Sequence, residues 1–228
     1  MSKRSTTETK PGATPAEAPV PFGADRNIRV GAPFLAAAAL FVSRDKTRPY
    51  LGGVYIEPAK GGGALLVASD GHRLIALRDP NGVCEKPFIC AVPGVLRKFV
   101  NEKNVGHVHF VGHQAQVTTS WGTLSDIVTA PPVDDEYPDW RNSIPAQKTT
   151  RPVTFFNVNG AYIGDFARAA QIMNGGTIAG LTITSVGNEK SPLLVTAETC
   201  NGPLFGLQMP VAIEGGDRPA SIPDWIIR

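Results

Sequence analysis

The stretch that most constrains the fold is residues 64–80, where two short apolar segments flank a polar centre. Residues 65–68 and 74–77 are apolar and have strand-like length, whereas the centre reads Ser-Asp-Gly-His-Arg. Asp-Gly favours a turn or bulge, because glycine tolerates a positive φ and the aspartate side chain can bond the backbone that follows it. The sequence therefore predicts two strands joined by a kink, with His72 and Arg73 presented at a sheet edge instead of being buried.

Strand-like and helix-like segments recur in the same order three times along the chain. Each unit begins with a strand, continues with a helix and ends with further strands, although the copies share negligible sequence identity. The expected strands are residues 27–30, 54–57, 64–77, 87–92, 108–111, 116–120, 124–129, 153–158, 181–186, 193–197 and 204–209. The expected helices are residues 32–43, 93–103 and 160–173. This order predicts an α+β protein built from three strand–helix–strands repeats.

Three segments outside the repeats differ from them in composition. Residues 1–26 are rich in Thr, Pro and Ala with almost no bulky apolar side chain, which predicts a disordered tail. Residues 131–152 form a polar, Pro-rich connector between the second and third units. Residues 214–228 form a C-terminal tail that turns on Gly-Gly and ends in Trp-Ile-Ile-Arg.

The composition is that of a globular protein, with 42% apolar and 18% charged residues. A formal net charge of +2 gives no sign of a strongly basic nucleic-acid binder, so any positive patch must be local. The cysteines Cys84, Cys90 and Cys200 have no metal-type spacing, and we expect them to be small buried residues of a reduced protein. Because no apolar run approaches the ~20 residues of a membrane helix, we expect a cytoplasmic protein.

Four sequence blocks together resemble the bacterial replicative sliding clamp family, the beta subunit of DNA polymerase III. In chain order they read RPYLGGVYIE at 48–57, LVASDGHRLI at 66–75, YPDWRNSIP at 137–145 and LQMPVAI at 207–213. No single block is specific, but four in sequence at clamp-like spacing make coincidence improbable. The resemblance implies the DNA-clamp fold, in which helices line a central hole and sheets form the outer wall.

The resemblance covers only part of a clamp subunit. Residues 27–145 correspond to the middle clamp domain and residues 152–213 to the second half of the last domain. An ordinary beta clamp closes as a dimer of three-domain subunits with a dozen such units, whereas this chain holds three. We therefore expect the unpaired third unit to pair with the same unit of a second copy, and a tetrameric ring to form from these dimers.

The family binds short peptide motifs of polymerases and other clients in an apolar pocket at the hinge between the middle and last domains. Matched position by position, the pocket here comprises Leu51, Ser69, Gly71, His72, Arg73, Leu74, Pro138, Leu207, Met209 and Pro210. The resemblance implies that His72 and Arg73 donate hydrogen bonds to the peptide backbone. Asn142, Ser143 and Ala212 depart from the family pattern, so a changed peptide preference is expected. That these residues only hold the fold together stays an open alternative.

A ring that slides needs phosphate contacts and no base readout. The candidates for these contacts lie on or beside the three expected helices and are Arg44, Lys46, Arg48, Arg97, Lys98, Lys103 and Arg168. The resemblance therefore implies a DNA sliding clamp and polymerase processivity factor, with no catalysis and no cofactor. Its expected partners are duplex DNA of any sequence, a polymerase and other clamp-binding proteins, while the need for a clamp loader stays open.

Two alternatives belong to other functional classes. The first is a metal-dependent enzyme, in which His107 and His109 share one face of a strand and His113 follows at the next. The second is a clamp-like regulator that competes for clamp clients without encircling DNA. Asp70 and His72 could also suggest acid–base catalysis, although no nucleophile motif accompanies them.

The C-terminal tail allows a further hypothesis. Its Trp225, Ile226 and Ile227 could fill the peptide pocket of the same or a neighbouring copy, since they resemble the apolar anchors of a client. Packing of these residues on the outer sheet is the alternative.

Overall fold

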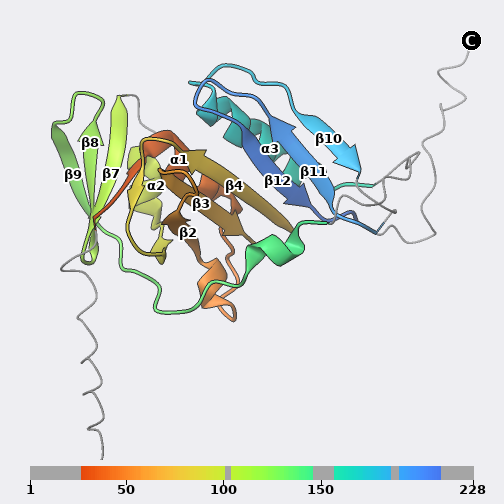
Figure 1. Ribbon diagram of the computed structural model, residues 1–228, viewed down its shortest axis with the longest axis horizontal. Coiled ribbons are helices and arrows are strands. Elements are labelled where there is room, and N and C mark those ends of the chain that lie inside the picture. Colours follow the sequence, from red (N-terminus) through yellow and green to blue (C-terminus); the bar gives the residue numbers. More distant parts are fainter. Residues whose placement is uncertain (1–26, 101–103, 146–156, 186–189, 212–228) are drawn as a thin grey trace, which may run out of the picture.

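The computed structural model describes residues 27–100, 104–145, 157–185 and 190–211, which form two antiparallel β-sheets (Figure 1). The larger sheet has seven strands in the order β10-β11-β12-β4-β3-β2-β6, and the smaller has five in the order β5-β1-β7-β8-β9. The larger sheet comprises β10 (Thr182–Ser185), β11 (Leu193–Ala197), β12 (Leu204–Gln208), β4 (Arg73–Asp79), β3 (Ala64–Ser69), β2 (Gly53–Pro58) and β6 (Phe88–Ala91). The smaller comprises β5 (Val83–Cys84), β1 (Ile28–Gly31), β7 (Val105–Val111), β8 (Gln114–Thr119) and β9 (Leu124–Thr129).

Three α-helices and three short 3₁₀ turns complete the described part of the chain. They are α1 (Ala32–Ala38), η1 (Ala39–Phe41), η2 (Pro49–Leu51), α2 (Gly94–Val100), η3 (Trp140–Ser143) and α3 (Gly160–Met173). The first helix is shorter than expected, because the α-helical turns end at Ala38 and the chain continues as 3₁₀ to Phe41. The bounds of α3 are confirmed, and the Asn159 side chain caps it by accepting from the Ala161 N–H at 3.0 Å.

Several expectations fall partly or wholly on residues that the structure leaves undescribed. Of the strand expected at 153–158, only Asn157 and Val158 are described, and they form no strand. The end of the second expected helix, the N-terminal tail and the C-terminal tail also lie outside the described residues. The α+β class with its strand–helix–strands units is otherwise confirmed.

The three units are joined through their sheets. The first strand of each of the first two units pairs with the other unit, since β1 pairs with β7 and β6 pairs with β2. The third unit extends the first, because β12 pairs with β4 from Leu204 opposite Leu77 to Gln208 opposite Arg73. We call this β4–β12 pairing the seam, and Figure 1 shows the blue third unit continuing the sheet from β4.

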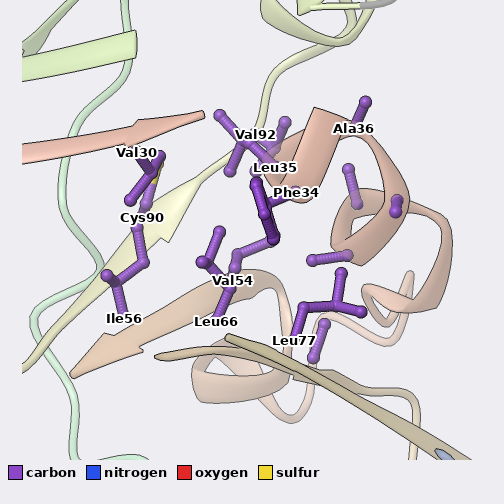
Figure 2. Close-up of a cluster of buried hydrophobic side chains, with 14 of the residues drawn as sticks. Val30, Phe34, Leu35, Ala36, Val54, Ile56, Leu66, Leu77, Cys90 and Val92 are labelled. Carbon is purple, nitrogen blue, oxygen red and sulfur yellow. The ribbon is translucent and has the colours of Figure 1, made fainter. Parts of the chain in front are cut away.

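The main hydrophobic core lies between the helices and the sheets. Helix α1 packs against both α2 and α3, and Figure 2 shows Phe34 and Leu35 of α1 directed toward Val54 and Leu66 of the larger sheet. Helix α3 contributes one buried stripe at helical spacing, formed by Phe166, Ala169, Ala170 and Met173. Gly206 of β12 leaves room for the Phe166 ring, with which any Cβ at that position would clash.

A second hydrophobic cluster lies on the opposite face of the larger sheet. Successive residues of β3 point to opposite faces, so Leu66 enters the main core while Val67 enters this second cluster. The second cluster spans the seam and comprises Leu51, Val67, Leu74, Ala76, Ile89, Tyr137, Trp140 and Leu207. The helices therefore occupy one side of the larger sheet and the connector that carries Tyr137 occupies the other.

The cysteines differ in their exposure. Cys84 and Cys90 are buried as expected, whereas the expectation for Cys200 is wrong, because its side chain is exposed. Among the described residues, no helix combines the length and the apolar character needed to cross a membrane.

Candidate peptide-binding pocket and basic surface

The Asp-Gly turn joins β3 to β4 and is closed by its own side chains, which confirms the turn predicted there. The Asp70 carboxylate accepts hydrogen bonds from the backbone N–H groups of His72 at 2.9 Å and Arg73 at 3.1 Å. Gly71 has a φ of 91°, a conformation that glycine adopts without a steric penalty. The Ser69 hydroxyl donates to the Arg73 carbonyl at 2.8 Å and accepts from the Gly71 N–H at 3.1 Å. The turn is thus rigidly hydrogen-bonded.

Arg73 is buried, so the prediction that it lies at a sheet edge is wrong. Strand β4 lies between β3 and β12 inside the larger sheet, and Arg73 is only 9% exposed. Its guanidinium pairs with Asp70 at 3.0 Å and with Asp165 of α3 at 2.5 Å, and it donates to the Leu40 carbonyl at 3.2 Å. It also lies over the Tyr162 ring, 4.4 Å from the centroid. The third unit supplies the strand and the helix that cover Arg73.

A cavity of about 240 Å³ lies at the end of the seam beside this turn. Nine of the ten residues predicted for the peptide pocket line it, namely Leu51, Ser69, Gly71, His72, Arg73, Leu74, Pro138, Leu207 and Met209. Pro210 is not among the lining residues. We call this cavity, with its lining residues, the DGHR pocket. The fold brings together residues from the first unit, the connector and the third unit, which are far apart in the sequence.

Six further residues line the DGHR pocket that the sequence prediction missed. They are Tyr50, Tyr137, Asp139, Trp140, Ser143 and Pro192. Four of them belong to the YPDWRNSIP block, from which only Pro138 was predicted. The signal that could have found them is the aromatic pair around Pro138, because large apolar rings in a polar connector need a surface to pack against.

Turn η3 is held over the larger sheet by a charged contact. The Arg141 guanidinium donates to the Glu57 carboxylate of β2 at 2.6 Å and lies over the Trp140 ring at 4.4 Å from its centroid. This hydrogen bond from Arg141 to Glu57 is the main cause that raises the pKa of Arg141. Asp139 begins the turn by accepting from the Arg141 N–H at 3.2 Å. These contacts fix the connector as one wall of the DGHR pocket.

The floor of the DGHR pocket is apolar. Leu51, Leu74 and Leu207 are buried there together with Tyr137 and Trp140. Burial, and second to it charge repulsion with the ionisable hydroxyl of Tyr55, raises the pKa of Tyr137 above its usual range, and the two rings stack with centroids 4.7 Å apart. The Tyr137 hydroxyl and the Trp140 indole nitrogen have no hydrogen-bond partner in the described part of the chain. Such a floor is suited to burying apolar side chains of a ligand.

The rim of the DGHR pocket carries its polar groups. His72 is exposed as expected, and its ring stacks on Tyr162 with centroids 6.4 Å apart. The His72 carbonyl accepts from the Met209 N–H at 2.9 Å, which ties the turn to the end of β12. Ser69 and Asp70 are engaged within the turn, so the geometry favours ligand binding over acid–base chemistry between Asp70 and His72.

The predicted DNA-contacting residues divide into exposed, engaged and undescribed ones. Arg44 and Lys46, in the loop after η1, Lys98 of α2 and Arg168 of α3 are exposed. Arg97 of α2 is half-buried, and burial, followed by the nearby Arg44 charge, lowers its pKa. The side chain of Arg48 instead pairs with Asp45 at 2.9 Å and reaches the Asp70 carbonyl at 3.4 Å, close to the turn. Lys103 lies outside the described residues.

The three histidines of the metal hypothesis do not form a metal site. Strand β7 places His107 opposite Thr118 and His109 opposite Gln116 of β8, while His113 lies in the turn that follows. Across the described ranges, no group of three His, Cys, Asp or Glu side chains is arranged to hold a metal ion. The metal-dependent enzyme is therefore not supported by the geometry.

Comparison with known proteins gives a clear result at the level of structure only. No protein-family model matches the chain, and no curated protein matches its sequence. A DNA polymerase III beta sliding clamp from Bartonella birtlesii bound to griselimycin is similar with a TM-score of 0.56 and 18% identity, over 87% of this chain and 68% of that chain. The DNA polymerase III beta subunit from Pseudomonas aeruginosa gives a TM-score of 0.56 and 16% identity, over 90% of this chain and 70% of the other.

A third clamp agrees with these two. The DNA polymerase III beta chain from Streptococcus pneumoniae gives a TM-score of 0.51 and 15% identity, over 90% of this chain and 68% of that chain. At such identities the likeness concerns the fold, and the resemblance of the four sequence blocks agrees with it. The chain therefore has the fold of the bacterial DNA polymerase III beta sliding clamps, and its match covers 68–70% of the length of these three clamps.

Proposed function

We propose that this protein is a DNA sliding clamp, a polymerase processivity factor that encircles duplex DNA as a homo-oligomeric ring in the cytoplasm. The observation that carries the proposal is the clamp fold itself, with helices on one side of the larger sheet and the DGHR pocket at the end of its seam. The pocket tethers a polymerase and other clients through extended peptide segments. The protein has no catalysis of its own.

The free sheet edges support assembly from several copies. Strands β9 and β10 each end a sheet without a further partner strand in the described residues. Beside the first of these edges, Trp121 is 88% exposed, and Leu124 and Ile127 are about half exposed. Unpaired strand edges next to exposed apolar side chains are the surfaces that a second copy covers. Two copies join through their third units at β10, and two such dimers join at β9 to close a tetrameric ring.

Contact with DNA is made on the helix side through phosphate charge. Arg44, Lys98 and Arg168 are exposed candidate cations, contributed by the loop after η1, by α2 and by α3. Their replacement by alanine should weaken binding equally for all sequences and reduce the slope of log K against log salt by about one for each cation removed. The matched control is Arg78→Ala, which removes an exposed charge from the opposite face of the larger sheet.

The decisive experiment compares retention on circular and linear DNA. The protein is placed on a nicked circular duplex, with a loading factor where one is needed, and the circle is then cut once. A ring stays on the circle and leaves through the new ends, because it is held by topology. Equal loss from both forms would contradict encirclement, and peptide binding without retention on the circle would indicate a regulator that competes for clamp clients.

A further inference from the structure

A second cavity with acidic lining residues lies beside the DGHR pocket. It has a volume of about 540 Å³ and is lined by Tyr55, Pro87, Phe88, Ile89, Val133, Asp134, Asp135, Glu136 and Tyr137. Tyr137 lines both cavities, so they are adjacent along the connector. Asp134, Asp135 and Glu136 are exposed, and none of the ion pairs found among the described residues involves them. An apolar site therefore lies next to an uncompensated negative one.

The chain leaves the described structure at the rim of the same pocket. Met209, which lines the DGHR pocket, is 42% exposed, and the Val211 N–H donates to the Asn157 carbonyl at 2.9 Å. Seventeen residues follow from Ala212 to Arg228, and they end in Trp-Ile-Ile-Arg. This ending has three large apolar side chains followed by one cation. The three apolar side chains match the apolar DGHR pocket, and the cation matches the acidic cavity beside it.

We propose that the tail of this chain occupies its own DGHR pocket, with Trp225, Ile226 and Ile227 in the apolar cavity and Arg228 beside the acidic residues. The proposal rests on the peptide-binding role proposed above for the pocket. The tail then inhibits the binding of client peptides to the same chain. A client gains the pocket only by displacing the tail. The acidic residues then select a client segment with a basic side chain next to its apolar anchors, since Arg228 vacates that place.

The linker is long enough for this contact. Thirteen residues, 212–224, separate the end of the described chain from Trp225. Fully extended they span roughly 45 Å, and as a flexible coil their root-mean-square span is about 20 Å. A linker of this kind holds its end at an effective concentration of roughly 1 mM, so a tail with a Kd of about 100 µM would weaken a competing peptide about tenfold.

The test uses a synthetic peptide of residues 220–228, ASIPDWIIR, labelled for fluorescence anisotropy. The peptide should bind a chain truncated after Ile213 about tenfold more tightly than it binds the full chain. The full chain with Trp225, Ile226 and Ile227 replaced by alanine should behave like the truncated one. Ser221→Ala in the full chain is the matched control and should leave the block in place.

Two sets of variants locate the bound peptide. His72→Ala and Met209→Ala, at exposed lining positions of the DGHR pocket, should each weaken the peptide for the truncated chain. The triple variant Asp134→Asn, Asp135→Asn, Glu136→Gln should weaken the peptide and remove most of the salt dependence of its binding. A peptide with Glu in place of Arg should bind the truncated chain more weakly than the original peptide does. Its affinity should rise when the truncated chain carries the triple substitution.

Three results would overturn the proposal. The first is equal affinity of the peptide for the truncated and full chains, and the second is an absence of binding to the truncated chain. The third is a block that weakens when the full chain is diluted, because that would place the tail in a neighbouring copy. None of these results bears on retention on circular DNA, so a failed tail contact and a failed clamp function are distinguishable.

Discussion

The seam and the β9 edge are two places where one unit presents the edge of a strand, and the chain treats them in opposite ways. At the seam, β12 completes the hydrogen bonding of β4, and side chains from three units bury the junction on both faces. At β9 no further strand pairs within the part of the chain that the structure describes, and Trp121, Leu124 and Ile127 are exposed beside it. A strand edge that is paired within the chain holds the fold together, whereas an unpaired strand edge is the kind of surface that a second copy covers.

Buried charge also distinguishes the seam from the β9 edge. The seam contains the Arg73 guanidinium, whose contacts with Asp70, Asp165 and the Leu40 carbonyl join β4, η1 and α3. An arginine this well buried is tolerated only where its donors find acceptors. Breaking the seam should therefore cost stability, and altering the β9 edge should change assembly alone.

The largest effect is expected from Arg73→Ala. Its removal leaves Asp70 and Asp165 without their cation and exposes part of the Phe41 and Tyr162 rings. We expect the free energy of unfolding to fall by about 2–4 kcal/mol, somewhat below the value for a fully buried pair because Asp165 is 37% exposed. Urea unfolding measures the change, and Arg78→Ala, an exposed charge on the same strand, should stay within about 0.5 kcal/mol of the parent.

A second change acts on the packing of the seam. Gly206→Ala places a methyl group against the Phe166 ring, which has little room to move because it also packs against Phe41 with centroids 4.7 Å apart. We expect a loss of about 1–3 kcal/mol in the same unfolding experiment, as for other overpacked cores. A companion Phe166→Leu substitution should recover part of that loss, and a fully stable Gly206→Ala protein would mean that α3 does not pack on β12 as described.

The tyrosines of the second hydrophobic cluster should make the free energy of unfolding fall at high pH. Burial, and then the Glu57 carboxylate, raises the pKa of Tyr55 to about 12, and burial raises that of Tyr137 still further. In the unfolded chain both ionise near pH 10, so the unfolded state loses protons first. Their contribution to stability is therefore complete below pH 10 and is lost as the pH rises toward 12.

Urea midpoints measured from pH 9 to 12 test this prediction. The double variant Tyr55→Phe, Tyr137→Phe should flatten the decline without abolishing it, because burial also raises the pKa of the Cys90 thiol. Identical declines for the parent and the double variant would argue against burial of this tyrosine pair.

The smallest effect on stability is expected at the free edge. Ile127→Lys changes a side chain that is 49% exposed, so the free energy of unfolding should stay within about 0.5 kcal/mol of the parent. The same substitution places a charge in the surface that we assign to a second copy. Sedimentation should show smaller particles for this variant, whereas unchanged particles would remove β9 from the assembly surface.

The sequence predicted local features well and the environment of Arg73 poorly. The Asp-Gly turn and helix α3 follow from residues close in the chain, namely the aspartate that bonds its own backbone, the asparagine cap and the apolar spacing of α3. Arg73 looked exposed because its turn is polar, yet its partner Asp165 lies 92 residues further along the chain. Only tertiary pairing of β4 with β12 brings those two charges together.

The dependence on tertiary pairing also explains which residues of the candidate site could be predicted. Residues matched through the four blocks gather around one cavity, because the blocks come from segments that meet at the seam. Tyr137 and Trp140 were missed because their role depends on the connector crossing the larger sheet, which no local pattern shows. The metal hypothesis gains no support, because strand alternation places His107 and His109 on one face, but β8 supplies no third ligand and no three-ligand group forms within the described ranges.

The mass of the assembled particle in solution tests most directly the idea that one chain is a sector of a ring. Native mass spectrometry or light scattering should give a particle of four copies, four times the 24.2 kDa of a single chain, and Ile127→Lys should reduce it to dimers. A single species with the mass of one chain at every concentration would contradict the ring, because three units alone cannot close around a duplex.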